Sequence, residues 1–135
     1  FAKRLYAVRT ISKQKKRFIV NQMLYLSVFE RMKEICTTKI PVTIIYFYSN
    51  SEDCKQCDAQ SFVLTDVNKY IDDEIAIFSF DIDIDVIATQ VLADYYNVSK
   101  NDLPCIILDK EKNCGLKDKS FVLKKICSKV NISLC

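Results

Sequence analysis

Two kinds of apolar pattern alternate along this chain of 135 residues. In residues 3–36 the apolar side chains recur about every 3.6 residues, and neither Gly nor Pro interrupts them, which predicts an α-helix. The basic run at residues 12–17 breaks the apolar stripe, so this segment is either two helices or one helix with a solvated middle. Pro41 marks the end of the helical pattern, because proline cannot continue a helix.

Beyond Pro41 the pattern changes to short strands and amphipathic helices. Residues 42–48 are nearly all β-branched or aromatic, which is typical of a strand buried on both faces. Similar apolar runs predict strands at 75–80 and 105–108. Helical spacing predicts three more helices, at 54–71, 86–96 and 118–130, and polar residues predict a turn at 110–113.

The buried faces of two of these helices follow from the same spacing. In the helix at 54–71 we expect one face to carry the apolar side chains Phe62, Val63, Val67, Tyr70 and Ile71. In the helix at 86–96 we expect Val91, Leu92 and Tyr95 to point inward.

Strands that alternate with helices predict an α/β fold with a central sheet flanked by helices. The first two strands are joined through a helix, so they should be parallel. The length suits one domain with an appendage. We therefore divide the chain into a basic N-terminal helical extension, residues 1–36, and an α/β domain, residues 37–135.

Charge separates the same two segments. Residues 1–36 carry nine Lys and Arg against two Glu, a net charge of +7, whereas residues 37–135 carry a net charge of −4. The acidic body disfavours nucleic acid as a partner, because it would repel phosphates. We expect the basic helix to pack on the domain, to associate with a second copy or a partner, or to lie near an anionic membrane. No apolar run reaches the roughly 18 residues of a membrane-spanning helix.

The chain has no histidine, which excludes His-based catalysis and His metal ligands, but it has seven cysteines. Cys54 and Cys57 lie where a buried strand passes into a predicted helix, behind the natural N-cap residues Ser51 and Asp53. Unpaired N–H groups at the first turn of a helix stabilise a thiolate and lower its pKa below about 8.5. One cysteine can then attack a disulfide and the other can resolve the mixed disulfide, with no cofactor and no metal.

The cysteines also allow functions other than redox chemistry. A metal-binding protein using Cys54, Cys57 and Cys105 is an alternative, but it lacks a second pair of ligands with compatible spacing. We expect Cys105 to pack in the core. Cys127 and Cys135 either join across the C-terminal tail or stay free, and connectivity cannot be deduced from sequence. Asp81, Asp83 and Asp85 alternate like a solvated strand end and lack the pattern of a calcium loop.

The order of these features resembles the thioredoxin superfamily over roughly residues 40–130. The resemblance rests on the strand ending in Tyr46-Phe47-Tyr48-Ser49, the Cys54-x-x-Cys57 pair, and Leu103-Pro104 ahead of an Ile-rich strand. It implies a thioredoxin-like sheet and a thiol–disulfide oxidoreductase that exchanges disulfides with protein thiols. It implies that Cys54 is the nucleophile, Cys57 the resolving cysteine, and Pro104 a cis-proline that turns the backbone of Leu103 toward a substrate chain.

The chain departs from the family at several residues. Asp53 replaces the Trp that precedes the first cysteine of thioredoxins, and Tyr46 replaces the buried acid of the central strand. Glu52 and Asp53 would raise the pKa of the thiol, while Lys55 and the helix end would lower it. Oxidant, reductant and isomerase therefore all stay open as directions of the reaction.

A binding function is the main alternative to catalysis. In that alternative the fold is a peptide-binding or chaperone-type module with little turnover. If the chain is an enzyme, its expected partners are protein thiols or disulfides and a redox partner protein. The start at Phe1 rather than Met and the abundant cysteines favour an extracytoplasmic or secreted protein, with or without a membrane anchor before Phe1, over a cytoplasmic one.

Overall fold

The computed structural model describes residues 2–35, 41–50, 52–71, 74–129 and 135, with residues 2–13 described as backbone only. The elements follow in the order α1 (Ala2–Ile35), β1 (Val42–Tyr48), α2 (Cys57–Tyr70), β2 (Ile75–Asp81), α3 (Ile87–Tyr95), the 3-10 helix η1 (Lys100–Asp102), β3 (Cys105–Leu108), β4 (Glu111–Cys114) and α4 (Lys119–Lys129). None of the helices described there is long and apolar enough to cross a bilayer.

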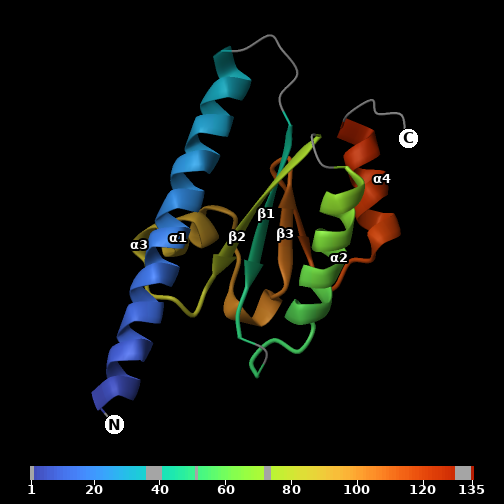
Figure 1. Ribbon diagram of the computed structural model, residues 1–135. Helices are drawn as coiled ribbons and strands as arrows, with labels where there is room; N and C mark the ends of the chain where they lie inside the picture. Colours follow the sequence, from blue (N-terminus) through green and yellow to red (C-terminus); the bar gives the residue numbers. More distant parts are fainter. Residues whose placement is uncertain (1, 36–40, 51, 72–73, 130–134) are drawn as a thin grey trace.

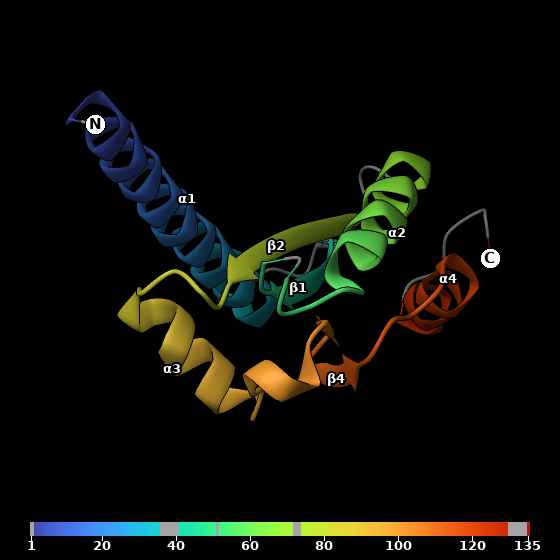
Figure 2. The same cartoon turned by 90° about the horizontal axis from the view of Figure 1, so that it is seen from below.

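The four strands form one mixed sheet in the order β2-β1-β3-β4. β1 pairs with β2 in parallel, as the helical connection between them predicts, and with β3 in antiparallel. Helices α1 and α3 cover one face of the sheet, and α2 and α4 cover the other (Figure 1; Figure 2 shows the same layers end on). The predicted α/β class with an additional N-terminal helix is confirmed.

β1 contributes to both hydrophobic cores, because successive side chains of a strand point to opposite faces. Ile44 and Tyr46 pack with the side chains of α2 and α4. Ile45 and Phe47 belong to the core beneath α1 and α3. Six of the seven residues of β1 are buried, which accounts for its β-branched and aromatic composition.

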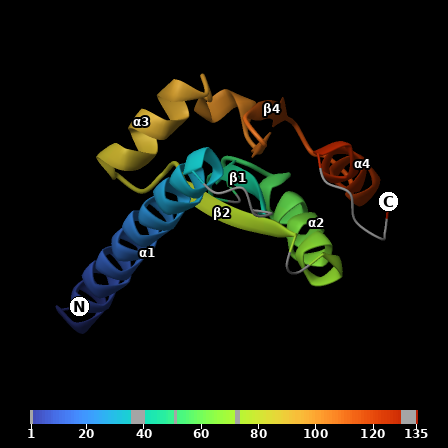
Figure 3. The ribbon, with the colours of Figure 1, turned by 90° about the horizontal axis from the view of Figure 1, so that it is seen from above.

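Helix α1 is a single helix that continues through the basic run at residues 12–17. Ile19 and Leu26 are buried in the core of the sheet, and the ring of Phe29 packs edge-on against Phe78 of β2. The amide oxygen of Gln22 accepts a hydrogen bond from the backbone N–H of Ser79, at 3.1 Å. The N-terminal part of α1 extends past the sheet (Figure 3).

Two predicted helix faces are wrong in part. Phe62 and Tyr70 of α2 are exposed, and so are Val91 and Tyr95 of α3. The buried face of α2 instead includes the polar Gln60. Its side chain exchanges two hydrogen bonds with the backbone of Lys117, at 3.1 and 2.7 Å, so its burial leaves no polar group unpaired.

β3 and β4 form a hairpin closed by the two residues Asp109 and Lys110. Both have positive φ, 48° and 71°, as the turn of a two-residue hairpin requires. Residues 111–113, which polarity assigns to a turn, therefore belong to an edge strand, where polar side chains face solvent. The register places Cys105 directly opposite Cys114.

The packing of α1 gives a stability prediction. Leu26 is 4 % exposed, whereas Leu24 on the same helix is 61 % exposed. We expect Leu26→Ala to lower the free energy of unfolding by about 2 to 4 kcal/mol, because it leaves a cavity between α1 and the sheet. The matched change Leu24→Ala should cost about 0.5 kcal/mol or less. Denaturant unfolding of the oxidised protein measures both, and equal effects would contradict this packing.

Candidate functional site

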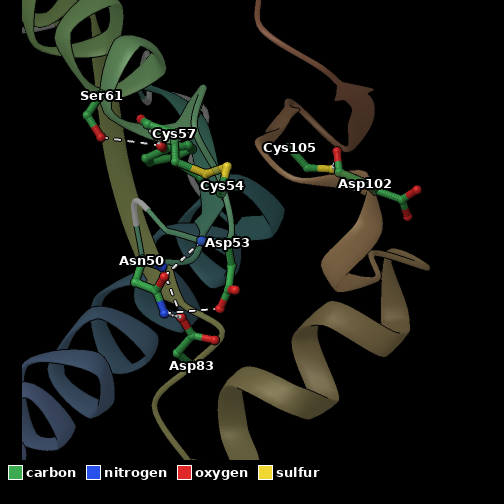
Figure 4. The surroundings of a disulfide bond; sticks show 9 residues. Asn50, Asp53, Cys54, Cys57, Ser61, Asp83, Asp102 and Cys105 are labelled. Atoms are coloured by element: carbon green, nitrogen blue, oxygen red, sulfur yellow. Dashed lines mark hydrogen bonds between the residues drawn. A yellow bond between two sulfur atoms is a disulfide. The ribbon is translucent and has the colours of Figure 1, made fainter.

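Cys54 and Cys57 lie at the end of the sheet where β1 finishes. They are joined by a disulfide with a Cα–Cα distance of 5.4 Å. Both are buried, and Cys54 keeps more of its surface, 6 % against 2 % for Cys57. Figure 4 shows the pair with its surroundings.

The helix after the pair starts later than its spacing predicts. α2 begins at Cys57, with Gln56 as its N-cap, so Cys54 lies in a turn just ahead of the helix. The N–H of Cys57 donates to the carbonyl of Cys54 at 3.2 Å, and the N–H of Cys54 donates to the carbonyl of Asn50 at 2.9 Å. The pair therefore sits at the junction of strand and helix, with Cys54 one turn before α2.

Asp53 is not an N-cap of α2, contrary to the prediction from its residue type. Its carboxylate accepts a hydrogen bond from the Asn50 side-chain amide at 3.2 Å and pairs with Lys100 at 3.0 Å. Its backbone N–H donates to the side-chain oxygen of Asn50, which closes a local turn ahead of Cys54. Ser51, the other expected cap, lies outside the described residues.

Tyr46 projects from β1 to the start of α2. Its hydroxyl donates to the carbonyl of Cys57 at 2.6 Å and accepts a hydrogen bond from the Ser61 hydroxyl at 3.3 Å. Burial raises the pKa of Tyr46 to about 12. At neutral pH this phenol is therefore a hydrogen-bond donor that fixes the Cys57 backbone, and it is not a proton acceptor.

Leu103 and Pro104 lie at the same end of the sheet as the cysteine pair. Phe47 of β1 is opposite Cys105 of β3, so the residues ahead of Cys105 start where β1 ends. The Leu103–Pro104 peptide bond is cis. Pro104 is buried and its carbonyl accepts from the N–H of Gly115, while Leu103 is half-buried with extended backbone angles.

Two further disulfides join Cys105 to Cys114 and Cys127 to Cys135. Cys105 is fully buried, as expected, and the bond to Cys114 crosses the β3–β4 hairpin. Cys36 lies outside the described residues. The three cysteines of the metal hypothesis are thus divided between two disulfides, and no cluster of three Cys, Asp or Glu that could hold a metal ion occurs within the described ranges.

Sequence reasoning missed the roles of three residues next to the loop that precedes Cys54. Asn50 donates its N–H and its side-chain amide to Asp83, at 2.9 and 2.7 Å, and Lys100 pairs with Asp83 at 3.0 Å. Hydrogen bonds from Asn50 lower the pKa of Asp83. Asp83 is thus the centre of a network rather than only part of a solvated strand end. The signal in the sequence was the alternating Asp residues at 81, 83 and 85.

Comparison with known proteins identifies the fold. No protein-family model matches the sequence, and no curated protein is similar enough to count as a match. The solved structure of thioredoxin-2, described as a component of the malaria parasite protein secretion machinery, has 24 % identity and a TM-score of 0.55, over 65 % of this chain and 82 % of that one. Another malarial protein has 23 % identity and a TM-score of 0.55, over 68 % of this chain and 99 % of that one. At these identities the similarity shows the fold alone, and the resemblance to thioredoxins is confirmed as a thioredoxin fold.

The contact between Tyr46 and Cys57 gives a second stability prediction. Tyr46→Phe removes the hydroxyl and leaves the Cys57 carbonyl without that donor. We expect a loss of about 1 to 2 kcal/mol in the free energy of unfolding, the range for a buried hydrogen bond whose partner stays behind. Tyr70→Phe, at an exposed tyrosine, should change the stability far less. Denaturant unfolding distinguishes the two, and a neutral Tyr46→Phe would contradict the bond.

The same tyrosine predicts a loss of stability in alkali. The pKa of Tyr46 in the folded protein, about 12, is above its ordinary value of 10.0. The contribution of the protonated phenol is therefore complete below pH 10 and is lost as the pH rises toward 12. Burial also raises the pKa values of Tyr48 and Tyr96, so we expect the phenolate absorbance that appears near pH 12 to be smaller by one tyrosine in Tyr46→Phe and to be retained in Tyr70→Phe. A wild-type titration complete by pH 11 would contradict the burial of this hydroxyl.

Proposed function

We propose that this chain, which has the thioredoxin fold, is a thiol–disulfide oxidoreductase that exchanges disulfides with protein thiols through Cys54 and Cys57. One observation carries the proposal: the two cysteines are disulfide-bonded at the end of β1, at the same end of the sheet as the segment that contains Leu103 and Pro104. The fold alone does not imply the activity, since many functions share one fold. The proposal therefore depends on the pair and its neighbours.

In the reductive direction the proposed reaction has two steps. The Cys54 thiolate attacks one sulfur of a substrate disulfide, forms a mixed disulfide and releases one substrate thiolate, which takes up a proton. Cys57, after losing its proton to solvent, attacks the Cys54 sulfur, re-forms the Cys54–Cys57 disulfide and releases the second substrate thiol. Two electrons pass from the pair to the substrate, and the oxidative direction is the reverse.

The roles of the two cysteines follow their exposure. Cys54 retains 6 % of its surface and Cys57 retains 2 %, so an incoming disulfide reaches Cys54 first. The sulfur of Cys57 can bond to the sulfur of Cys54, so Cys57 is suited to resolve the mixed disulfide between Cys54 and the substrate. The hydrogen bond from Tyr46 to the Cys57 carbonyl supports this role, because it holds the start of α2 in place.

Leu103 and Pro104 form the proposed substrate-binding segment. The extended backbone of Leu103 suits pairing with an extended peptide, which would add to the site as a strand adds to a sheet edge. Pro104, buried behind it, fixes where β3 begins. We therefore propose that the partners are protein chains that carry thiols or disulfides, together with a redox protein that regenerates the pair.

The three disulfides, which contain six cysteines, also indicate the cellular compartment in which the protein works. Disulfides persist in oxidising compartments and are rare in reducing ones. We propose that the chain works outside the reducing cytosol.

Replacement of each active cysteine by serine tests the proposed activity. We expect Cys54→Ser to reduce a protein disulfide no faster than the uncatalysed rate, because the attacking sulfur is missing. Cys57→Ser should accumulate a mixed disulfide with the substrate through Cys54. Turnover is followed by the appearance of substrate thiols, and the trapped adduct by mass spectrometry under non-reducing conditions.

The matched control removes a different disulfide. Cys127→Ser/Cys135→Ser eliminates two cysteines of the C-terminal disulfide and should retain turnover. Wild-type activity in Cys54→Ser would refute the proposal. Peptide binding without turnover in the wild type would instead favour a binding module. The reduction potential of the pair, measured on the same samples, assigns the direction.

A further inference from the structure

Four polar side chains form a connected network next to Cys54. Lys100 contacts Asp53 and Asp83, each at 3.0 Å, and Asn50 donates to both carboxylates. Figure 4 shows Asn50, Asp53 and Asp83 turned toward one another beside the disulfide. Lys100 is the only cation paired with these two carboxylates in the described part of the chain.

The network joins three segments that are distant in the sequence. Asn50 and Asp53 belong to the loop between β1 and α2, and Asp83 to the loop after β2. Lys100 is the first residue of η1, three residues before Leu103. Lys100 therefore links the loop that carries the attacking cysteine to the segment proposed to bind substrate.

The charges around Cys54 are mostly negative. The segments that meet at this end of the sheet contribute seven carboxylates, on Glu52, Asp53, Asp58, Asp81, Asp83, Asp85 and Asp102, and the cations Lys55 and Lys100. Two more cations act on members of this set: burial raises the pKa of Asp81 and Lys15 of α1 lowers it in part, while hydrogen bonds from Ser99 and, more weakly, the charge of Lys112 of β4 lower the pKa of Asp102. Lys117, which lies against the start of α2 through Gln60, has its ammonium group over the ring of Phe121. The phenol of Tyr46 stays neutral.

We propose that Lys100 is a positioning residue of the disulfide exchange: by pairing with Asp53 and Asp83 it offsets their charge beside Cys54, favours the thiolate, and fixes the cysteine loop against the segment at Leu103. The inference rests on the proposed function. Asp53 precedes Cys54 directly, so an unpaired carboxylate there disfavours a second negative charge on the sulfur.

The size of the effect is limited by solvent. The side chains of Lys100 and Asp53 are about half exposed, at 51 % and 48 %, while Asp83 is 24 % exposed. Exposed ion pairs are screened by water and salt, so a large effect is not expected. We expect removal of the Lys100 charge to lower the thiolate fraction of Cys54 near neutral pH about two- to fivefold.

The test measures the alkylation rate of reduced Cys54 against pH, by mass spectrometry of the Cys54 peptide in the Cys57→Ser background. Lys100→Gln should move the pH midpoint upward and slow alkylation at pH 7 about two- to fivefold. Asp53→Asn should move it downward, and Asp53→Asn/Lys100→Gln should return it near the parent. In 1 M salt the difference between Lys100→Gln and its parent should shrink.

Two matched variants distinguish this role of Lys100 from a general effect of removing a surface charge. Lys119 pairs with Asp66 at 3.0 Å and is similarly exposed, on the α2–α4 side of the molecule, so Lys119→Gln should leave the midpoint unchanged. Lys100→Arg keeps the charge and should restore most of the reactivity. If Lys100→Gln unfolds, Lys100→Arg and Asp53→Asn still report the coupling through their own midpoints.

The outcomes distinguish this inference from the function on which it rests. An unchanged midpoint in Lys100→Gln, or an equal shift in Lys119→Gln, overturns the role of Lys100 while leaving the catalytic role of Cys54 intact. Wild-type turnover in Cys54→Ser overturns the proposed function, whereas the alkylation midpoints do not depend on turnover.

Discussion

The antiparallel pairing of β1 with β3 is the contact on which the candidate site depends. Both strands are buried on both faces, and their register sets Phe47 against Cys105. The chain that leaves β1 and the chain that enters β3 therefore meet at one end of the sheet, although Cys54 and Pro104 are fifty residues apart in sequence. A slip of the register by one residue would turn every side chain of β3 to the opposite core, so burial on both faces fixes the geometry of the site.

The local sequence pattern predicted an element correctly where burial alone determines which side chains it contains. The run at 42–48 allowed a single interpretation, because its β-branched and aromatic side chains suit a strand buried on both faces. The helix faces were predicted less well. Gln60 is buried because the backbone of Lys117 satisfies its amide, and an apolar count cannot anticipate that partner. Phe62 and Tyr70 have the right residue type for a core but lie on the solvent side of α2.

Some features of the candidate site could likewise be predicted from the sequence, and others could not. The Cys54–Cys57 pair is visible because its spacing and its junction are local features. The Cys105–Cys114 bond was hidden by its turn: Asp109-Lys110 adopts a hairpin conformation for which Asn-Gly is the usual signal. The contacts of Lys100 with Asp53 and Asp83 depend on three loops that only the sheet brings together, so no spacing within the sequence could reveal them.

Helix α1 packs on one face of the sheet and also reaches the backbone of its edge strand, β2. β2 ends the sheet on that side, and the Gln22 side chain takes the backbone hydrogen bond of Ser79 that a neighbouring strand would otherwise accept. Unpaired edges recruit other chains and promote aggregation. A side chain on a helix can satisfy a backbone group of such an edge without continuing the ladder, and Gln22 of α1 does so at Ser79. The edge of the sheet at Ser79 is thus protected by a helix that lies outside the candidate disulfide site.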